Sequence, residues 1–164
     1  MPTKDDIGNR GEAIFELRIT DPHGPGGDPL FRPYHLGEKF PTLDYLVELV
    51  GLPAGRVGYF FAQIKSTRKG FTKRPPARLQ VKVSQRDIDR MLTYPGPTYV
   101  IGIDGRPDYE LAYIVSVNKS GMGQIQGLPP TFLLDAANLN ALWKEVQGFW
   151  SKQNMPLNDS MFDI

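Results

Sequence analysis

The sequence contains no cysteine, only two histidines and no long hydrophobic run. Without cysteine there is no disulfide, no thiolate zinc site and no cysteine nucleophile, and His23 and His35 are the only imidazoles. We therefore expect no structural zinc. No run approaches the roughly 18 apolar residues of a membrane span, and the first residues, MPTKDDIGNRGE, lack the apolar core of a signal peptide. We expect a cytoplasmic protein with no membrane partner.

An excess of charge of one sign is also missing. Nineteen basic side chains are balanced by eighteen acidic ones, so the net charge of +1 neither indicates nor excludes a nucleic-acid partner. A chain of 164 residues with 40% hydrophobic content has the size of one domain with one core. We predict a single domain over residues 1–150 and a C-terminal tail over residues 151–164. That tail is compatible with docking on a partner or a second copy, and equally with a disordered end.

Hydrophobic periodicity predicts helices at both ends of the chain and strands between them. Asp5 or Asp6 is the expected cap of the first helix, which must end at the stretch 21–29 with its three Pro and three Gly. The order of elements predicts an α/β fold, with a mixed central sheet of about five strands flanked by helices. The predicted elements are helices at about 6–20, 84–94 and 135–150, and strands at 30–36, 42–50, 58–67, 97–104 and 110–117.

Three polar residues interrupt the predicted apolar strands. Gln63 and Lys65 in GYFFAQIKST are two residues apart, so they project from one face of a strand and place an amide oxygen beside an ammonium group. Asp44 lies 19 residues upstream, and a hairpin through GLPAGR would bring it beside them. Such oxygens can hold a divalent cation while the lysine orients or deprotonates water. The alternative is that Asp44 ends a strand at a solvent edge and that the other two residues lie on an exposed face.

Glu12, within the first predicted helix, is a fourth candidate. Gly11 precedes it, and a glycine inside a helix costs roughly 1 kcal/mol of stability relative to alanine. We therefore expect another part of the chain to approach the helix closely at this point. The alternative is that Glu12 is a surface residue in a frayed first turn, since Glu16, four residues later, shows that acids on this helix need not be catalytic.

The segments GNRGEAIFELRI, LDYLVEL and FFAQIKST, in this order, resemble the layout of the PD-(D/E)XK nuclease superfamily over about residues 7–118. They are most similar to small bacterial domains of unknown function in that superfamily, and more distantly to Holliday-junction resolvases and Mrr-type restriction endonucleases. The resemblance implies a restriction-endonuclease-like core with α-β-β-β-α-β topology. It also implies that Mg²⁺ or Mn²⁺ is held by Asp44, Gln63 and Glu12, and that the catalytic residues are Glu12, Asp44, Gln63 and Lys65.

The sequence departs from the family pattern at two positions. Leu43 stands where a proline would precede the aspartate, and Gln63 stands where an acid is commonest. Glutamine here resembles the Mrr-type branch and removes one negative charge from the metal site. Two functions follow from the resemblance. The first is a metal-dependent nuclease that acts on DNA, in a restriction or defence context; the alternative is a catalytically inactive, nuclease-like scaffold that binds nucleic acid or a protein partner.

A block of basic residues begins at Lys65. The 22-residue window 65–86 contains eight basic residues and no acid, and its stretch GFTKRPP is expected to be a mobile loop. Such a surface suits the phosphate backbone of a nucleic acid, although a solvated basic loop is the alternative. Cutting two strands with one site per chain suggests a homodimer, and the small size suggests a separate targeting protein. The expected nucleic-acid-binding residues are Arg68, Lys69, Lys73, Arg74, Arg78, Lys82 and Arg86.

Overall fold

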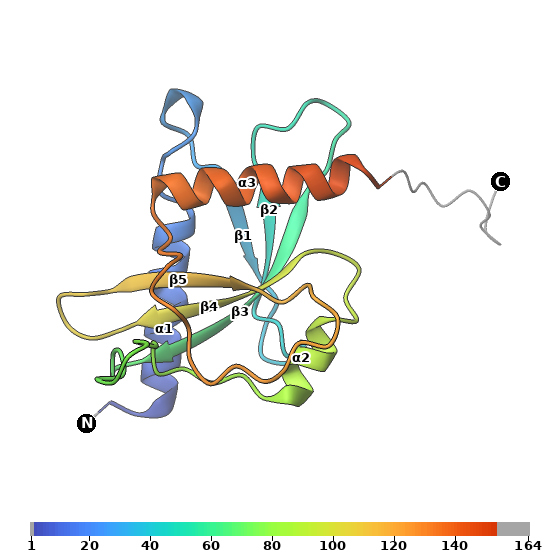
Figure 1. Ribbon diagram of the computed structural model, residues 1–164. Coiled ribbons are helices and arrows are strands. Elements are labelled where there is room, and N and C mark those ends of the chain that lie inside the picture. Colours follow the sequence, from blue (N-terminus) through green and yellow to red (C-terminus); the bar gives the residue numbers. More distant parts are fainter. Residues whose placement is uncertain (1, 154–164) are drawn as a thin grey trace.

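The computed structural model describes residues 2–153, in which a mixed sheet is flanked by helices (Figure 1). The predicted α/β fold and its element order are confirmed. The part of the predicted tail after Gln153 lies outside the described residues. The helices are α1 (Lys4–Ile19), α2 (Gln85–Met91), α3 (Ala136–Ser151) and the short 3₁₀-helix η1 (Pro25–Gly27). The strands are β1 (Phe31–His35), β2 (Tyr45–Leu49), β3 (Tyr59–Thr67), β4 (Thr98–Asp104) and β5 (Leu111–Ser116).

The five strands form one sheet in the order β1-β2-β3-β4-β5. Strands β2 and β3 form the antiparallel hairpin expected around GLPAGR, and β1 and β5 pair in the antiparallel sense with β2 and β4. Strands β3 and β4 run parallel, so the chain must cross over between them, and α2 lies in that connection. The sheet is therefore mixed, with β1 and β5 as its two edges.

Two apolar clusters cover the two faces of the sheet. The first joins α1 and α3 to the strands through residues such as Phe15 and Val146. The second lies under α2, where Ile88 and Met91 pack on the opposite face. Among residues 2–153, none of the helices is both long enough and apolar enough to cross a bilayer.

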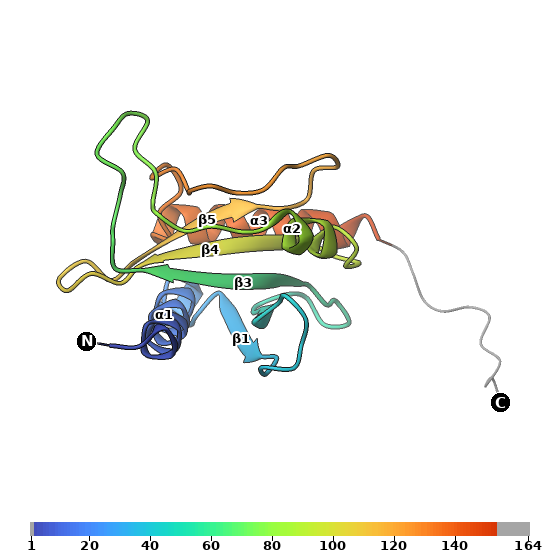
Figure 2. The same cartoon turned by 90° about the horizontal axis from the view of Figure 1, so that it is seen from below.

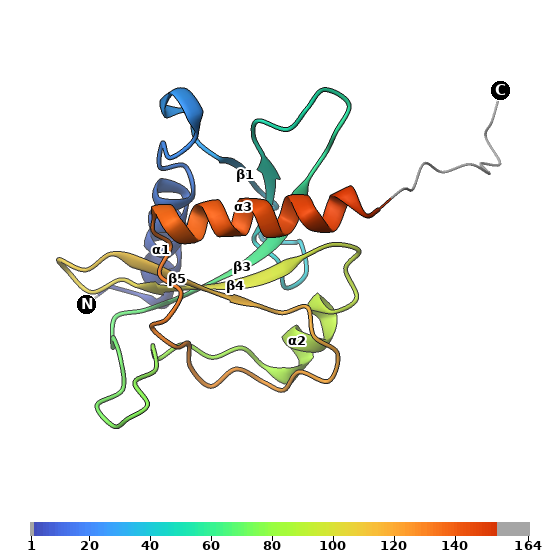
Figure 3. The same cartoon turned by 45° about the horizontal axis from the view of Figure 1, so that its top comes forward.

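Helix α3 is attached to the sheet by two tryptophans. The indole N–H of Trp143 donates to the carbonyl oxygen of Val50 at 2.9 Å, and that of Trp150 donates to the carbonyl oxygen of Tyr59 at 2.7 Å. These bonds hold the helix against the end of β2 and the beginning of β3. Figure 3 shows α3 lying across the sheet. Because a buried indole N–H needs a partner, the two bonds also fix the helix register.

Helix α1 begins earlier than its sequence predicts, and its cap is Thr3. The Thr3 hydroxyl accepts a hydrogen bond from the Asp6 N–H at 3.2 Å, while the Asp6 carboxylate accepts one from the Thr3 N–H at 2.7 Å. This reciprocal pair is a capping box, which satisfies two main-chain donors at once. The prediction of Asp5 or Asp6 as the cap was therefore wrong, because Asp6 occupies the third helical position.

Helix α2 begins as predicted and ends early. The Ser84 hydroxyl accepts a hydrogen bond from the Asp87 N–H at 3.1 Å, so Ser84 caps the helix. The helix ends at Met91 because the Thr93 hydroxyl donates to the Arg90 carbonyl oxygen at 2.7 Å and the following residues form a turn.

The segment between β3 and α2 projects from the body of the molecule (Figure 2). Its ends are joined by a bridge between Phe71 and Leu79. Within it, the Thr72 N–H donates to the Arg78 carbonyl oxygen at 2.8 Å, and the Arg78 N–H donates to the Thr72 hydroxyl at 3.0 Å. The predicted loop is therefore a hydrogen-bonded hairpin-like projection, with the sequence KRPPA at its tip.

Candidate active site

Strand β3 places Gln63 and Lys65 on the face of the sheet that α2 covers. Phe60 and Ala62 belong to the cluster under α1 and α3, whereas Phe61 belongs to the cluster under α2. Because side chains alternate along a strand, Gln63 and Lys65 lie on the same face as Phe61. The two residues therefore project together, as their spacing predicts.

The side chain of Gln63 is buried without a partner for its oxygen. Only 4% of this residue is exposed. Among residues 2–153, its Oε1 is the only buried side-chain nitrogen or oxygen that makes no hydrogen bond. Such an atom costs on the order of 1–3 kcal/mol of stability, so it requires an explanation. A ligand that binds the amide oxygen would supply one.

Asp44 lies one residue before β2, where its carboxylate ends the strand ladder. Its Oδ2 accepts a hydrogen bond of 2.6 Å from the Ile64 N–H, and its own N–H donates to the Ala62 carbonyl oxygen at 2.9 Å. Tyr45 pairs with Ala62, so the next position in the register places Asp44 opposite Gln63. The predicted strand 42–50 is therefore shorter than expected, because the side chain replaces a main-chain acceptor. The predicted juxtaposition of Asp44 and Gln63 is nevertheless formed.

Burial raises the pKa of the Asp44 carboxyl above its ordinary value. The Asp44 pKa is lowered by the hydrogen bond from the Ile64 N–H and by the charges of Lys65 and His35, but less than burial raises it. The negative charge of Asp87 raises it further. These influences place Asp44 within electrostatic range of Lys65. A positive charge bound beside Asp44 would offset the cost of its burial.

Helix α1 packs on the other face of the sheet from Gln63 and Lys65, and it brings Glu12 within electrostatic range of Asp44. A Cβ atom on Gly11 would lie 1.6 Å from the Ser66 Oγ of β3, which confirms the predicted close approach and explains the glycine. Burial raises the pKa of the Glu12 carboxyl, and repulsion from Asp44 contributes to the rise. His35 opposes that rise, since its Nε2 lies 3.3 Å from the Glu12 carboxylate. The two acids predicted to share a metal are therefore electrostatically coupled.

Two residues near the site did not stand out in the sequence. His35 ends β1 and pairs with Tyr45, the neighbour of Asp44, and so its imidazole reaches Glu12. Asp87 accepts a hydrogen bond from the Thr42 hydroxyl at 3.1 Å and adds negative charge near Asp44. A histidine or aspartate at a helix or strand end is common in any protein. Only the pairing of β1 with β2 could have drawn attention to His35.

The donor set fits a hard cation with some ligands supplied by water. Over residues 2–153, no three His, Cys, Asp or Glu side chains are grouped as a metal site. The predicted set contains two carboxylates and the Gln63 amide. Asp44 stands opposite Gln63 in the register, whereas Glu12 lies on α1, which packs on the other face of the sheet from Gln63. Mg²⁺ is commonly held by one or two carboxylates and several waters. By chemical type and position, Asp44 and Gln63 could therefore hold Mg²⁺ or Mn²⁺ with waters completing the shell, and Glu12 would have to reach the same ion from α1.

The basic block is almost fully open to solvent. Of the seven expected nucleic-acid-binding residues, Arg78 is half-buried and the other six are exposed. None of the seven lies within 4.0 Å of a carboxylate among the described residues, where the arginines in ion pairs are Arg10, Arg32 and Arg106. Their charge is therefore not neutralised within residues 2–153. The segment that carries them directly follows the strand of Gln63 and Lys65.

Comparison with protein-family models, with curated proteins and with solved structures gave no significant match to this chain. The residues of the site and their geometry therefore carry the functional argument.

Proposed function

We propose that this protein is a metal-dependent nuclease of the PD-(D/E)XK type that hydrolyses phosphodiester bonds in DNA. The observation that carries the proposal is the buried Gln63 oxygen without a partner, on the same strand face as Lys65 and opposite Asp44. A structural role would have paired that oxygen with a donor, whereas a metal ligand needs it free. The raised pKa values of Asp44 and Glu12 support a site that receives positive charge.

In this proposal each residue has a distinct task. Asp44 and Gln63, with Glu12 directly or through water, hold Mg²⁺ or Mn²⁺, which when bound polarises the phosphoryl oxygen and stabilises the charge that develops on it. The Ile64 N–H orients the Asp44 carboxylate. Lys65 positions the attacking water and offsets negative charge on the pentavalent phosphorus. His35 holds Glu12 in place.

The basic block supports a nucleic-acid substrate. Its exposed, unpaired cations are suited to contact successive phosphates of a backbone that leads into the site. We propose that the protein acts in the cytoplasm, in a restriction or defence role. Because one chain carries one such site, cutting both strands of a duplex would require a homodimer or two successive events.

The decisive experiment compares cleavage by the wild type, Lys65→Ala and the control Lys144→Ala, whose lysine is exposed on α3. Supercoiled plasmid, linear duplex, branched DNA and RNA are each incubated with Mg²⁺, Mn²⁺ or EDTA. We expect metal-dependent cleavage of at least one DNA, reduced about 10²-fold or more in Lys65→Ala and unchanged in Lys144→Ala. Cleavage that persists in Lys65→Ala, or in EDTA, would reject this mechanism.

The second candidate is a nuclease-like scaffold that binds nucleic acid or a protein without cutting. Two observations favour it: an amide stands at position 63, where an acid is commonest in the family pattern, and no three acidic or imidazole side chains form a metal group within residues 2–153. Isothermal titration separates the two functions. Absence of a Mg²⁺ or Mn²⁺ site, together with salt-dependent DNA binding by the folded protein, would establish the scaffold.

A further inference from the structure

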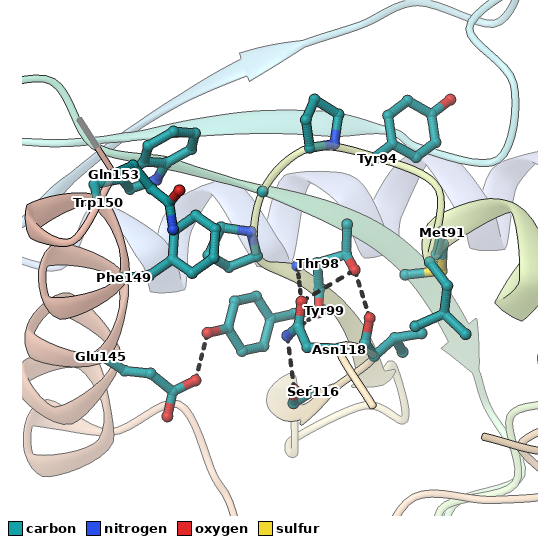
Figure 4. Close-up of a pocket in the computed structure, with 15 residues that line it drawn as sticks. Met91, Tyr94, Thr98, Tyr99, Ser116, Asn118, Glu145, Phe149, Trp150 and Gln153 are labelled. Atoms are coloured by element: carbon teal, nitrogen blue, oxygen red, sulfur yellow. Dashed lines mark hydrogen bonds between the residues drawn. The ribbon is translucent and has the colours of Figure 1, made fainter. Parts of the chain in front are cut away.

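A groove runs between α3 and the edge strand β5, away from the candidate active site. It consists of a pocket of about 580 Å³ and an adjoining one of about 190 Å³, which share Tyr99, Ser116 and Glu145 in their walls. Figure 4 shows the larger pocket, with Phe149 and Trp150 of α3 on one side and Met91 on the other. None of the residues assigned to the nuclease site lines either pocket. The groove is therefore separate from the candidate active site.

The walls of the groove are largely apolar and carry one charge. Phe149 in the larger pocket is 37% exposed and Phe132 in the smaller one is 49% exposed, so each pocket presents an aromatic ring to solvent. Glu145 is the only charged residue that lines either pocket. Its Oε1 accepts a hydrogen bond from the Tyr99 hydroxyl at 2.5 Å, and it forms no ion pair within residues 2–153. The groove therefore favours an apolar group joined to a cation.

The edge of β5 offers main-chain hydrogen bonds in the same groove. The Ile114 N–H donates to the Phe132 carbonyl oxygen at 2.9 Å, and the Ala112 carbonyl oxygen accepts from the Leu134 N–H at 2.8 Å. Along a strand, every second residue directs its main-chain N–H and carbonyl to the same edge. After Ala112 and Ile114, Ser116 is therefore the next residue of β5 whose main-chain groups face this edge. Ser116 is exposed and lines both pockets. Its main-chain N–H and carbonyl are thus available for an added strand.

We propose that this groove binds an extended segment of a partner protein, in which an apolar side chain stands beside a Lys or Arg. The segment adds to the edge of β5 at Ser116, its apolar side chain enters the larger pocket, and its cation pairs with Glu145. Charge complementarity selects this occupant. Nucleic acid is disfavoured as an occupant because the only charged residue in the groove is negative. The C-terminal segment 154–164 of this chain is disfavoured as well, because its sequence contains two aspartates and no Lys or Arg.

Selection from a phage-displayed library of random decapeptides, with the full-length protein as bait, tests this proposal. We expect the selected peptides to carry Lys or Arg beside an apolar residue and to shift the amide NMR signals of Ser116 and Glu145. Selection of acidic peptides, selection of none, or binding that shifts only other signals would overturn the proposal. Because binding is measured in EDTA without nucleic acid, the result does not depend on nuclease activity.

Two pairs of variants locate the binding determinants. Glu145→Gln keeps an acceptor for Tyr99 and is expected to weaken a selected peptide about tenfold, whereas Glu38→Gln, in an exposed loop, should have no effect. Ser116→Pro removes the edge N–H, which the pairing with Tyr99 of β4 does not use, and should abolish binding. Ser116→Ala keeps that N–H and should bind normally. Equal binding by all four folded variants would reject the assignment.

Discussion

Gly11 determines how closely α1 approaches the sheet. A methyl group at this position would overlap the Ser66 side chain, whereas Gly8 in the same helix has no atom within 4 Å of the equivalent position. We expect Gly11→Ala to lower the free energy of unfolding by about 1–3 kcal/mol, since the helix must move. Gly8→Ala should raise it by about 0.5–1 kcal/mol through helix propensity. Urea unfolding of the two variants measures both changes.

The double variant Gly11→Ala/Ser66→Gly provides the control for this close approach. Removal of the Ser66 side chain removes the two atoms closest to the added methyl group, so the double variant should recover part of the stability. If Gly11→Ala were as stable as Gly8→Ala, the close packing of α1 on β3 would be refuted.

Asp44 is expected to destabilise the metal-free protein at neutral pH. Its pKa is raised in the folded state, chiefly by burial, so the folded protein holds the proton more tightly than the unfolded chain. Stability must then fall as the pH rises from the ordinary pKa of 3.8 through the raised value. Asp44→Asn, which cannot ionise, should melt at a higher temperature than the wild type at pH 7 in EDTA. Below pH 3.8 the difference should disappear.

Thermal unfolding between pH 3 and pH 8, followed by circular dichroism in EDTA, measures this effect. Asp28→Asn is a suitable control because Asp28 is exposed in a loop. If Asp44→Asn were the less stable protein at pH 7, the carboxylate would be a stabilising structural group.

At the residue scale, the sequence revealed Gly11 but not His35. A glycine within a helical pattern is itself unusual, and this drew attention to the close approach that the structure contains. The contact of His35 with Glu12 depends on the crossing of β1 and α1, which lie 23 positions apart at these residues. Local pattern contains no information on such a crossing.

At the element scale, the projecting segment between β3 and α2 is expected to bind DNA through its charge. Lys73 and Arg74 are exposed near its tip and form no ion pair within residues 2–153. Lys73→Gln/Arg74→Gln should weaken DNA binding and lower the slope of log affinity against log salt by about 0.9 for each phosphate that the variant no longer neutralises. Fluorescence anisotropy with a labelled duplex in EDTA at several salt concentrations measures this slope.

Lys144→Gln/Lys152→Gln is the matched control, because it also removes two positive charges but does so on and beside α3. An equal decrease in slope for both double variants would show that the effect is one of net charge, and the projection would then have no specific role.

Element types could be predicted from the sequence more reliably than element ends. The continuous apolar run at the start of β3 and the periodicity in α1 and α3 are long enough to indicate the type of each element locally. The ends depend on single side chains that compete with the main chain for hydrogen bonds: Thr3 extends α1, Thr93 shortens α2, and Asp44 ends the β2 ladder. The last of these three is also the proposed metal ligand.

At the scale of the whole molecule, the candidate active site and the groove differ in how far the sequence could predict them. The juxtaposition of Asp44 with Gln63 was predictable because the two residues lie on strands that are consecutive in the chain and pair as an antiparallel hairpin. The groove requires α3 to cross the sheet beside β5, and this packing is fixed by Trp143 and Trp150 bonding to distant carbonyl groups. Those long-range bonds have no counterpart in local sequence pattern.

The proposed metal site should link cation binding to the stability of the whole fold. A cation present at 100 times its dissociation constant stabilises a protein by about 2.7 kcal/mol, which would raise the melting temperature by roughly 5–10 °C for a chain of this size. Gln63→Met removes the partnerless oxygen at similar volume, so the metal-free variant should gain about 1–3 kcal/mol and no longer respond to Mg²⁺ or Mn²⁺.

Lys65→Ala separates metal binding from catalysis, because the lysine is not a proposed ligand. It should keep the metal-induced rise in melting temperature and no longer cleave DNA. Differential scanning calorimetry of the wild type and the two variants, with metal and with EDTA, measures the responses. If Gln63→Met were destabilised in EDTA, the Gln63 amide would be a structural group whose hydrogen bonds hold the core, and a metal could not be the reason for its burial.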